Sequence, residues 1–360
     1  MADPIKVAYL FGAGATHAER YLECKLENSG LEDGRPKIGL TSEDVSKGVI
    51  DALLKKHSDR LEVYGIDENW AKPTASPKKV DIEFFISMLE TLKTPEAEKD
   101  ARLMRELFYK EINNRLHINK SKIKPRLHAA LLEWHKLNRK NEHLVGFLSV
   151  NYDSMLEEAH YLTEAEFDYG FNADISDSNN NRYRQGARYL LKLHGSFDWR
   201  LDPADAVVRV TNSVPTDKML WIPPRLNKDY LGYPYNTLQG TAEEVLRECE
   251  VLRIIGCSLS QNDLGLIALI FKTQKTGERN RFVVEYIGSE EGLQRIVKRL
   301  GILLTFDEES FYTKPDFTIW GEIGTKNYLL DWLFYKVKNS NKDMRRTKYL
   351  KNVKSWIKIV

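Results

Sequence analysis

Four short apolar segments of this chain end in turns of small and polar residues, and most of these turns lead into a helical pattern. The segments are residues 6–11, 144–150, 188–193 and 251–255. Apolar runs of this length, bounded by turn signals, are typical of buried strands. Strands that alternate with helices favour a parallel sheet with crossover helices, so the sequence predicts an α/β fold.

The composition is that of an ordinary soluble globular protein. Of the 360 residues, 42% are hydrophobic and 29% are charged. The formal net charge of +2 gives no overall field that would favour nucleic acid. No apolar run approaches the roughly 20 residues that a membrane span needs. The first residues have no secretory character, so we expect a cytoplasmic protein without membrane contact.

Cysteine and histidine spacing excludes the common metal modules. Cys24, Cys249 and Cys257 are the only cysteines, and none belongs to a Cys-x-x-Cys pair. This pattern indicates neither a disulfide framework nor a zinc site. His128 and His135 lie seven residues apart, too far to share one ion on a straight helix without further ligands. We therefore expect no metal.

The helical patterns divide the chain into parts. Helical periodicity covers residues 43–57, 81–94, 98–115 and 125–138. We predict a Rossmann-like domain from residues 1–27 and 140–310, an inserted helical subdomain over 28–139, and a C-terminal helical tail over 311–360. The stretch 336–360 carries nine Lys or Arg against one Asp, with apolar residues at helical spacing. We expect this basic amphipathic helix to pack on its own domain or to form an oligomer or partner contact.

The first turn has the composition of a phosphate-binding loop. Gly12-Ala13-Gly14-Ala15-Thr16 follows the first apolar segment and precedes a helical pattern. Small residues let a phosphate approach the backbone, where amide groups and the helix dipole stabilise the anion. The third glycine of the full dinucleotide fingerprint is missing, so a simple tight turn is the alternative. Thr16-His17-Ala18-Glu19 also fits a capping box.

The second and third turns carry polar side chains at the ends of predicted strands. Asn151 and Asp153 follow residues 144–150, and either could hold a carboxamide, a ribose hydroxyl or a water. Alternatively, Asp153 or Ser154 only caps the next helix, where Ser154-x-x-Glu157 fits a capping box. His194 ends the run 188–193 and is followed by Gly195 and Ser196. Ligands of open α/β sheets bind at such strand ends.

A fourth turn could contact the same ligand, and a fifth predicted strand also ends in a turn. Gly256 and Ser258 follow residues 251–255, and Ser258 could bond a ribose or a phosphate. Gly288 and Ser289 follow a fifth predicted strand, residues 281–287. A tight turn between strand and helix is again the alternative for Gly256 and Ser258.

Together these motifs resemble a known superfamily. Gly-Ala-Gly-Ala-Thr, Val-Asn-Tyr-Asp-Ser-Met-Leu-Glu, Leu-Lys-Leu-His-Gly-Ser and Ile-Gly-Cys-Ser-Leu-Ser occur in this order. They resemble the sirtuin superfamily, specifically the sirtuin-like NAD-cleaving domains of bacterial anti-phage defence. The resemblance covers roughly residues 5–20 and 144–300, and it does not cover the helical block or the tail.

The resemblance implies a role for each matching residue. Gly12, Ala13, Gly14 and Thr16 match the phosphate-cradling loop, where the family usually has Ser in place of Thr. Asn151 and Asp153 match the pair that contacts the nicotinamide ribose and the carboxamide, and His194 matches the catalytic histidine. Gly256 and Ser258 match a turn that contacts the dinucleotide, and Gly288 and Ser289 lie where the family holds the adenine-side ribose.

Two departures change the activity that the resemblance implies. Deacylases of this superfamily carry four zinc-binding cysteines after the catalytic histidine, but residues 200–239 contain none. No Gly-Ile-Pro-x-Phe-Arg follows the first turn either. The resemblance therefore implies cleavage of NAD with water as acceptor rather than removal of an acyl group.

The main prediction is an NAD hydrolase that produces nicotinamide and ADP-ribose. NAD is then a substrate, and cyclisation of ADP-ribose stays open because the same residues could serve both reactions. The resemblance also implies gating of an NAD-depleting effector by a homo-oligomer or by a HerA-type ATPase partner. The alternative is a regulatory module that binds NAD or ADP-ribose without cleaving it. Nucleic-acid processing guided by the basic tail is the third reading, and no cluster of carboxylates supports it.

Overall fold

The structure is a computed structural model of the full chain. It describes residues 3–27, 29–32, 35–64, 81–171, 173–174, 184–204, 206–210, 215–226, 228–275, 282–288 and 290–301. Ser289 and the predicted tail, residues 311–360, lie outside the described residues.

A five-stranded sheet forms the centre of the molecule. Its order is β12-β11-β1-β6-β8, and all neighbouring strands run parallel. The strands are β1 (Ile5–Phe11), β6 (Glu142–Ser149), β8 (Tyr189–Lys192), β11 (Val251–Ile255) and β12 (Val283–Ile287). Because the chain moves outward from β1 in both directions, the strand order reverses there. Ligands of open α/β sheets bind at such a reversal.

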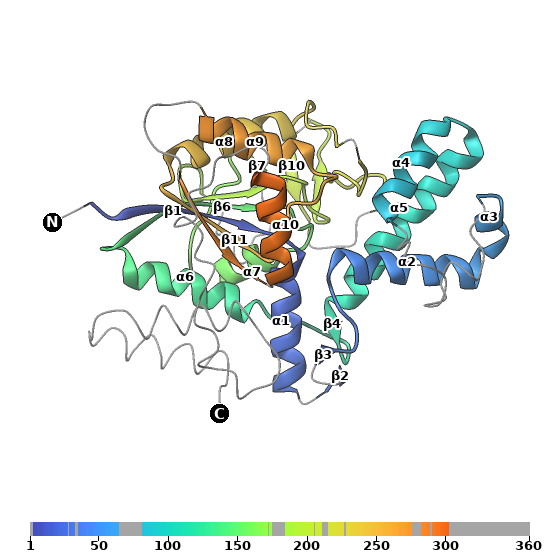
Figure 1. Cartoon of the computed structure of the whole chain (residues 1–360), viewed down its shortest axis with the longest axis horizontal. Coiled ribbons are helices and arrows are strands. Elements are labelled where there is room, and N and C mark those ends of the chain that lie inside the picture. The colour runs from blue at the N-terminus through green and yellow to red at the C-terminus, as the bar shows by residue number, and fades with distance from the viewer. Residues whose placement is uncertain are drawn as a thin grey trace.

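Helices cover both faces of this sheet. In Figure 1, α8 (Tyr235–Glu248) and α9 (Leu264–Lys275) lie above the sheet, and α1 (Ala13–Leu26), α6 (Arg126–Asn138) and α7 (Met155–Leu162) lie below it. The helix α10 (Glu290–Gly301) follows β12. This three-layer arrangement confirms the predicted α/β fold with crossover helices.

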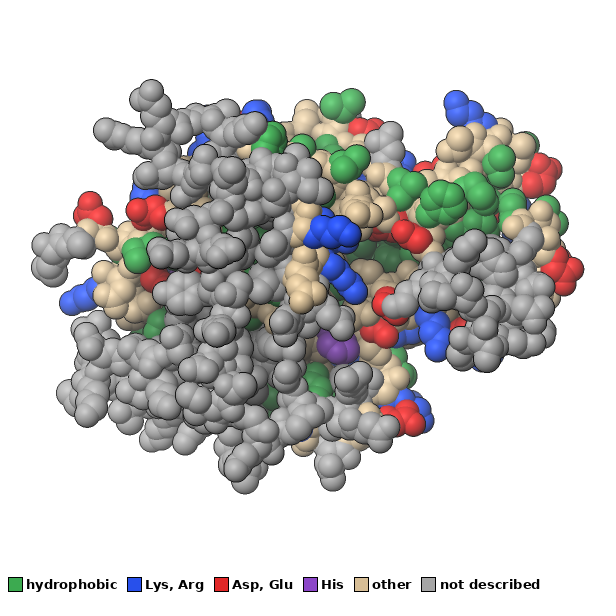
Figure 2. All heavy atoms as spheres, viewed as in Figure 1, with side chains coloured by type: hydrophobic (Ala, Val, Ile, Leu, Met, Phe, Trp, Pro, Cys, Tyr) green, Lys and Arg blue, Asp and Glu red, His purple; other side chains and the backbone are tan. Residues whose placement is uncertain are grey.

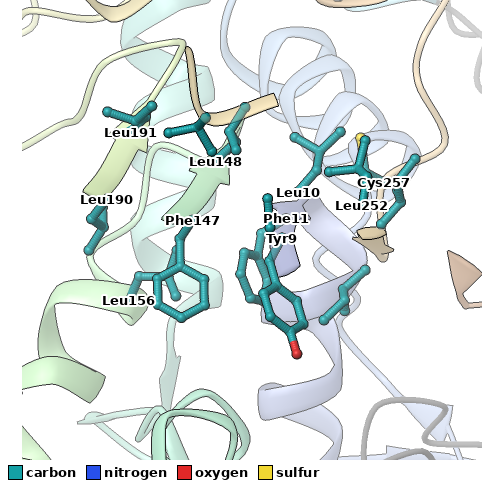
Figure 3. Packing of buried hydrophobic residues seen from close by; sticks show 14 of the residues in the cluster. Tyr9, Leu10, Phe11, Phe147, Leu148, Leu156, Leu190, Leu191, Leu252 and Cys257 are labelled. Carbon is teal, nitrogen blue, oxygen red and sulfur yellow. The ribbon is translucent and has the colours of Figure 1, made fainter. Parts of the chain in front are cut away.

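The strands are apolar throughout because both faces of the sheet are covered. Val7 to Phe11 in β1 have at most 1% of their surface exposed. Figure 3 shows Phe11 and Phe147 side by side in this core, and their ring centroids are 5.8 Å apart. Burial of one large side chain contributes about 1.5–3 kcal/mol, so each of these rings stabilises the domain appreciably.

A separate helical module, α2 to α5, stands beside the sheet domain at the right of Figure 1. It consists of α2 (Ser42–Lys56), α3 (Ser58–Glu62), α4 (Ile82–Leu92) and α5 (Pro95–Arg115), which share their own apolar core. Thr41 caps α2 through a reciprocal bond with Asp44, and Asp81 caps α4. Figure 2 shows hydrophobic side chains on the surface of this module, and Phe84 of α4 is 56% exposed.

Aromatic rings join the module to the sheet domain. Phe108 of α5 stacks on Trp221 at 6.1 Å, and Trp221 meets Tyr152 edge to face at 5.3 Å. Tyr152 stacks in turn on Phe197 at 5.1 Å. Aromatic pairs of this kind contribute about 0.5–1.5 kcal/mol beyond their burial. The module is therefore packed directly against residues that surround His194.

Short strands complete the fold. β7 (Ala173–Asp174), β10 (Val207–Arg209) and β9 (Trp199–Leu201) form a three-stranded sheet. Two small hairpins pair β2 (Leu31–Glu32) with β3 (Arg35–Pro36) and β4 (His117–Ile118) with β5 (Ser121–Lys122). No helix within the described ranges is long and apolar enough to cross a membrane.

Three details differ from the sequence predictions. The helix α6 packs in the core of the sheet domain, although the predicted helical subdomain extended to residue 139. Thr16 does not cap α1, because the helix already begins at Ala13 with Gly12 as its N-cap. Glu19 instead caps α6, where its carboxylate accepts the amides of Leu127 at 2.8 Å and His128 at 2.9 Å. The capping box proposed at Ser154 is also absent, since Ser154 makes no side-chain cap bond.

Candidate functional site at the carboxyl edge of the sheet

The predicted site residues gather along one edge of the sheet. The register pairs Phe11 with Ser149 and with Ile255, Ser149 with Lys192, and Ile255 with Ile287. The residues that follow these strand ends therefore lie side by side, since neighbouring strands are about 4.8 Å apart. From one end of the edge to the other, the predicted positions are Gly288, Gly256, Gly12, Asn151 and His194.

The glycine half of this edge, the turns after β1 and β11, is held by close backbone contacts. Gly12 N donates to Ile255 O at 3.0 Å, and Gly14 N donates to Gly256 O at 2.9 Å. A Cβ atom on Gly12 would lie 2.6 Å from Cys257 Cα, and one on Gly14 would lie 2.7 Å from Gly256 Cα. The small residues of both turns are thus required by their contact with each other.

The N-terminus of α1 lies in the same half and suits an anion. Gly12 is its N-cap and offers no side chain, and the first turn contains no acidic residue. Ala13 is the first residue of the helix and is partly exposed. The positive end of the helix dipole at this position would favour a negatively charged group.

The turn after β11 is closed from the other side by α10. Arg299 donates to the carbonyl oxygens of Ser258 and Leu259. Leu259 has a positive φ of 48°, which is uncommon for a residue with a side chain. Burial raises the pKa of Cys257 to about 12, so this thiol stays protonated and unreactive. Ser258 is partly exposed at this turn, and Gly288 follows β12 beside it.

The polar half of the edge, the turns after β6 and β8, is organised by side chains. Thr16 Oγ1 donates to Asp153 Oδ2 at 2.7 Å, and Asn151 Nδ2 donates to Thr16 Oγ1 at 3.1 Å and to Gly12 O at 3.0 Å. Both hydrogens of the Asn151 amide are therefore used. No hydrogen bond of the described residues uses its Oδ1 oxygen, which remains an acceptor for a ligand or a water.

Asp153 also stabilises the local structure, because both of its carboxylate oxygens accept hydrogen bonds from the protein. Its Oδ1 oxygen accepts the amide of Met155 at 3.0 Å, so the carboxylate binds the first turn of α7. Its Oδ2 oxygen accepts from Thr16, as described above. A carboxylate has about four lone-pair positions, so a further donor remains possible at this group.

His194 lies two residues beyond β8 and is tied to a carboxylate that the sequence did not reveal. Its Nε2 atom is 2.8 Å from Asp263 Oδ2 and 3.1 Å from the hydroxyl oxygen of Tyr230. Tyr230 donates this hydroxyl to Asp263 Oδ1 at 2.8 Å. His194 and Asp263 are each 5% exposed, so these contacts are shielded from water.

The charge of Asp263 is stabilised strongly. Burial alone would raise the pKa of this carboxyl, but His194, Lys228 and Tyr230 together outweigh this effect. The pKa of Asp263 is therefore held well below its usual range. Burial and the adjacent Asp263 raise the pKa of Tyr230, so its hydroxyl remains protonated as a donor.

The turn after His194 permits no side chain. Gly195 has a φ of +74°, and a Cβ atom there would lie 2.2 Å from Leu220 O. The segment 220–222 pairs with this turn, since Ile222 N donates to His194 O at 2.8 Å. The ring of Tyr152 lies 6.0 Å from the ring of His194, and its hydroxyl donates to Ile222 O at 2.8 Å. His194 is thus fixed from the backbone and from its ring face.

A buried ion pair lies beneath the polar half. Lys192 Nζ is 3.2 Å from Glu157 Oε1 and also donates to the carbonyl oxygen of Asp153. Tyr169 donates to Glu157 Oε1 at 3.2 Å. Burial raises the pKa of Glu157, and Lys192 opposes the rise. Lys192 thereby links the end of β8 to the turn that carries Asp153.

Sequence reasoning missed Asp263 and Tyr230. Asp263 lies just before α9, where its Oδ1 atom is 3.4 Å from the amide of Leu266, so its position reads as an ordinary helix cap. Tyr230 lies in the irregular stretch between β10 and α8. A carboxylate at the start of the helix after a predicted strand end was the available signal for Asp263. Nothing in the sequence indicated Tyr230.

The donors of this edge do not form a metal site. Across the described ranges, no group of three or more His, Cys, Asp or Glu side chains could hold a metal ion. Cys24, Cys249 and Cys257 are buried and free.

Known proteins resemble this chain in part. No curated protein matches it. Several solved structures resemble it at low identity, among them three structures of Sir2 proteins. A Sir2 homologue mutant in complex with 2'-O-acetyl ADP ribose shares 14% identity, covers 94% of each chain and has a TM-score of 0.41. Sir2 bound to an acetylated peptide shares 11% identity over 95% of each chain, with a TM-score of 0.39. A Sir2 homologue in complex with NAD shares 14% identity over 83% of this chain and 91% of that one, with a TM-score of 0.34. Residues 145–302, from β6 to the end of α10, match the family model described as a SIR2-like domain.

Proposed function

We propose that this chain is an NAD hydrolase that cleaves the bond between nicotinamide and ribose. The observation that carries the proposal is the placement of Asn151 and His194 at the ends of adjacent strands, on the same edge as the N-terminus of α1, which no side chain caps. The match of residues 145–302 to a SIR2-like domain supports NAD as the substrate, as does the similarity to a Sir2 homologue whose structure contains NAD.

Each part of the edge then has one task. The glycine half and the α1 N-terminus bind the pyrophosphate, with Gly12, Ala13, Gly14 and Thr16 in the first turn and Gly256 and Ser258 in the second. The amides of Gly12, Gly14 and Gly256 already donate to backbone carbonyls, so these glycines serve by letting the anion approach closely. The positive end of the α1 dipole supplies the attraction. Gly288 and Ser289 stay the proposed contacts for the adenine-side ribose. The polar half binds the nicotinamide ribose, because its side chains offer directed donors and acceptors.

The chemistry requires little more than positioning and one base. The nicotinamide ring nitrogen is cationic, so the ring leaves with its bonding electrons as neutral nicotinamide. Asn151 Oδ1 orients the incoming water, and His194 accepts a proton from it. A positioned base of this kind typically contributes about 10² to 10⁴ in rate. Asp153 holds the turn and accepts the carboxamide N–H at its remaining lone pairs.

The direct test is nicotinamide release by the purified chain. We expect the wild type to produce nicotinamide and ADP-ribose, and we expect His194→Ala and Asn151→Ala to lose at least about 10²-fold in kcat. His143→Ala is the matched control, because His143 is an exposed histidine of β6, and it should keep wild-type activity. Product identification by chromatography separates hydrolysis from cyclisation.

Two outcomes would contradict the proposal. Wild-type turnover by His194→Ala would remove His194 from the reaction. Binding of NAD in calorimetry without any product, alone and with partner proteins, would instead favour the regulatory binding module.

The same resemblance motivates a proposal for regulation. We propose that the chain is an NAD-depleting effector of anti-phage defence, kept inactive until it assembles as a homo-oligomer or with a HerA-type ATPase. Mass measurement after size exclusion tests this, with and without the ATPase. A persistent monomer in both samples would contradict gating by assembly.

A further inference from the structure

All hydrogen bonds of the His194 ring in the described part of the chain use one of its two nitrogens. Nε2 lies 2.8 Å from Asp263 Oδ2 and 3.1 Å from the Tyr230 hydroxyl. Nδ1 has no hydrogen bond to any described residue. The two nitrogens of this ring are therefore in different situations, and only one of them remains for a ligand.

We infer that Asp263 is a positioning residue that fixes His194 as the tautomer with its proton on Nε2, so that Nδ1 is the nitrogen that accepts a proton. An ionised carboxylate only accepts hydrogen bonds, so Nε2 must carry the hydrogen between them. A neutral imidazole has one N–H, so the lone pair then belongs to Nδ1. The inference rests on the proposed function for the identity of the proton donor.

Asp263 is held rigidly enough for this role. Its Oδ1 oxygen accepts the Tyr230 hydroxyl at 2.8 Å and faces the amide of Leu266 at the start of α9. The Tyr230 ring is fixed against Gly265, where a Cβ atom would lie 2.3 Å from Cε2 of the ring. With Oδ1 occupied in this way, Oδ2 is directed to His194.

The surroundings keep the Asp263 carboxylate ionised. Lys228 is almost fully buried, donates to Asn262 O at 3.0 Å and attracts the Asp263 charge. Tyr152 and Tyr230 face the pair as neutral groups, and Glu83 of α4 approaches Lys228 at 3.7 Å. No second carboxylate among the described residues contacts His194 directly.

The step that follows is balanced within the site. One O–H bond of the attacking water breaks and an Nδ1–H bond forms, while Nε2–H stays in place. The resulting imidazolium lies against the ionised Asp263, which stabilises it at the moment when the charge appears. Asp263 itself touches neither substrate nor water in this scheme.

The tautomer can be measured without any substrate. We propose nitrogen NMR of the full-length protein labelled in its eight histidines, at pH 8, with the His194→Ala spectrum used to assign the resonances of His194. The expected wild-type result is a protonated Nε2 and an unprotonated Nδ1. An unprotonated Nε2 in the wild type would overturn the inference.

Asp263→Asn is the decisive variant. Asn caps a helix about as well as Asp, so α9 should survive. Its Oδ1 oxygen keeps the Tyr230 and Leu266 donors, and its amide nitrogen then faces Nε2 and forces the proton to Nδ1. We expect the tautomer to reverse and kcat for nicotinamide release to fall about 10²-fold, with KM nearly unchanged.

Asn262→Ala is the matched control. Asn262 directly precedes Asp263, but its side chain is directed away from His194 and bonds Asp81, the cap of α4, at 3.0 Å. The tautomer and the rate should therefore stay as in the wild type. If Asp263→Asn changes neither tautomer nor kcat, Asp263 is only a helix cap and the inference fails. If the wild type releases no nicotinamide, the proposed function fails, and the NMR result still decides the role of Asp263.

Discussion

The two halves of the carboxyl edge are held together by different kinds of contact. In the glycine half, the turns after β1 and β11 touch through backbone atoms, and Gly14 N donates directly to Gly256 O. In the polar half, Thr16, Asn151 and Asp153 hold one another through side chains, and Asp263 holds His194. One half excludes side chains, and the other depends on them.

This difference predicts how each half responds to change. A glycine that is required by close contact should affect stability wherever a Cβ atom is added, whether or not a ligand binds. The polar half contains buried titratable groups, so it should also make the stability depend on pH. Substitutions in the two halves should therefore separate into steric effects and effects of charge or hydrogen bonding.

The largest expected effect is that of Gly256→Ala. The added Cβ atom would lie 2.3 Å from Ala15 N and 2.4 Å from Gly14 C, which are backbone atoms, and the residue has a φ of +58°. The clash and the strained backbone together should lower the free energy of unfolding by about 4 kcal/mol. Urea unfolding followed by circular dichroism measures this loss.

A second glycine provides the control for this substitution. Gly240 lies in α8, and a Cβ atom there meets nothing within 4 Å. Gly240→Ala should leave the stability unchanged or raise it by about 0.5–1 kcal/mol, because alanine favours a helix. Equal stability of Gly256→Ala and the wild type would show that the two turns are not in contact.

The next effect is a dependence of stability on pH, and it comes from a histidine of α7, the helix that follows the turn after β6. His160 of α7 is fully buried, its Nδ1 atom lies 2.7 Å from Leu156 O, and its Nε2 atom has no hydrogen-bond partner. Burial lowers the pKa of His160 to about 4, from an ordinary value of 6.5. The unfolded chain therefore binds a proton between these values that the folded chain does not.

Stability should consequently fall as the pH falls through this window. Above pH 6.5 the neutral His160 costs the fold nothing. As the pH falls to 4, the free energy of unfolding should decrease by about 3 kcal/mol on account of this residue. In His160→Phe, which suits the neighbouring rings of Phe147 and Phe167, this slope should disappear. Urea unfolding at pH 7 and pH 4 tests it, with the exposed His143→Ala as control. Parallel pH profiles of His160→Phe and the wild type would exclude this role.

Most elements of the sheet domain could be predicted from the sequence, because buried strands and helices each impose a regular spacing of apolar residues. The run Val251–Ile255 is predicted and observed with the same bounds, and the helices at 81–94 and 125–138 lie within a few residues of α4 and α6. Both faces of the sheet are covered, so its strands are apolar runs that stand out from amphipathic helices. The sequence did not show that α6 packs on the sheet, because its apolar residues could equally face the core of the sheet domain or that of the helical module.

The site was predictable only where it follows strand ends. Asn151 and His194 come directly after apolar runs, so their position at the edge followed from the fold. Asp263 and Tyr230 reach His194 from 69 and 36 residues further along the chain, and no local pattern encodes such a meeting. The capping-box pattern at Thr16 misled for the same reason, because the hydroxyl of Thr16 binds Asp153, which is 137 residues away.

Thr16 joins the two halves, so a substitution there tests whether they are independent. It belongs to the first helix of the glycine half, yet its hydroxyl donates to Asp153 and accepts from Asn151 in the polar half. Thr16→Val keeps the shape of this buried side chain and removes both bonds. The Asp153 oxygen then loses its donor, which should cost about 2 kcal/mol of unfolding free energy.

Thr16→Ser is the variant that separates shape from hydrogen bonding. It keeps the hydroxyl and removes only a methyl group, so it should stay within about 1 kcal/mol of the wild type. If Thr16→Val were as stable as Thr16→Ser, the hydroxyl would add nothing and the two halves would be joined by packing alone. If only Thr16→Val loses stability, one hydroxyl couples them. Because Thr16 also orients the Asn151 amide, nicotinamide release should then fall in Thr16→Val and persist in Thr16→Ser.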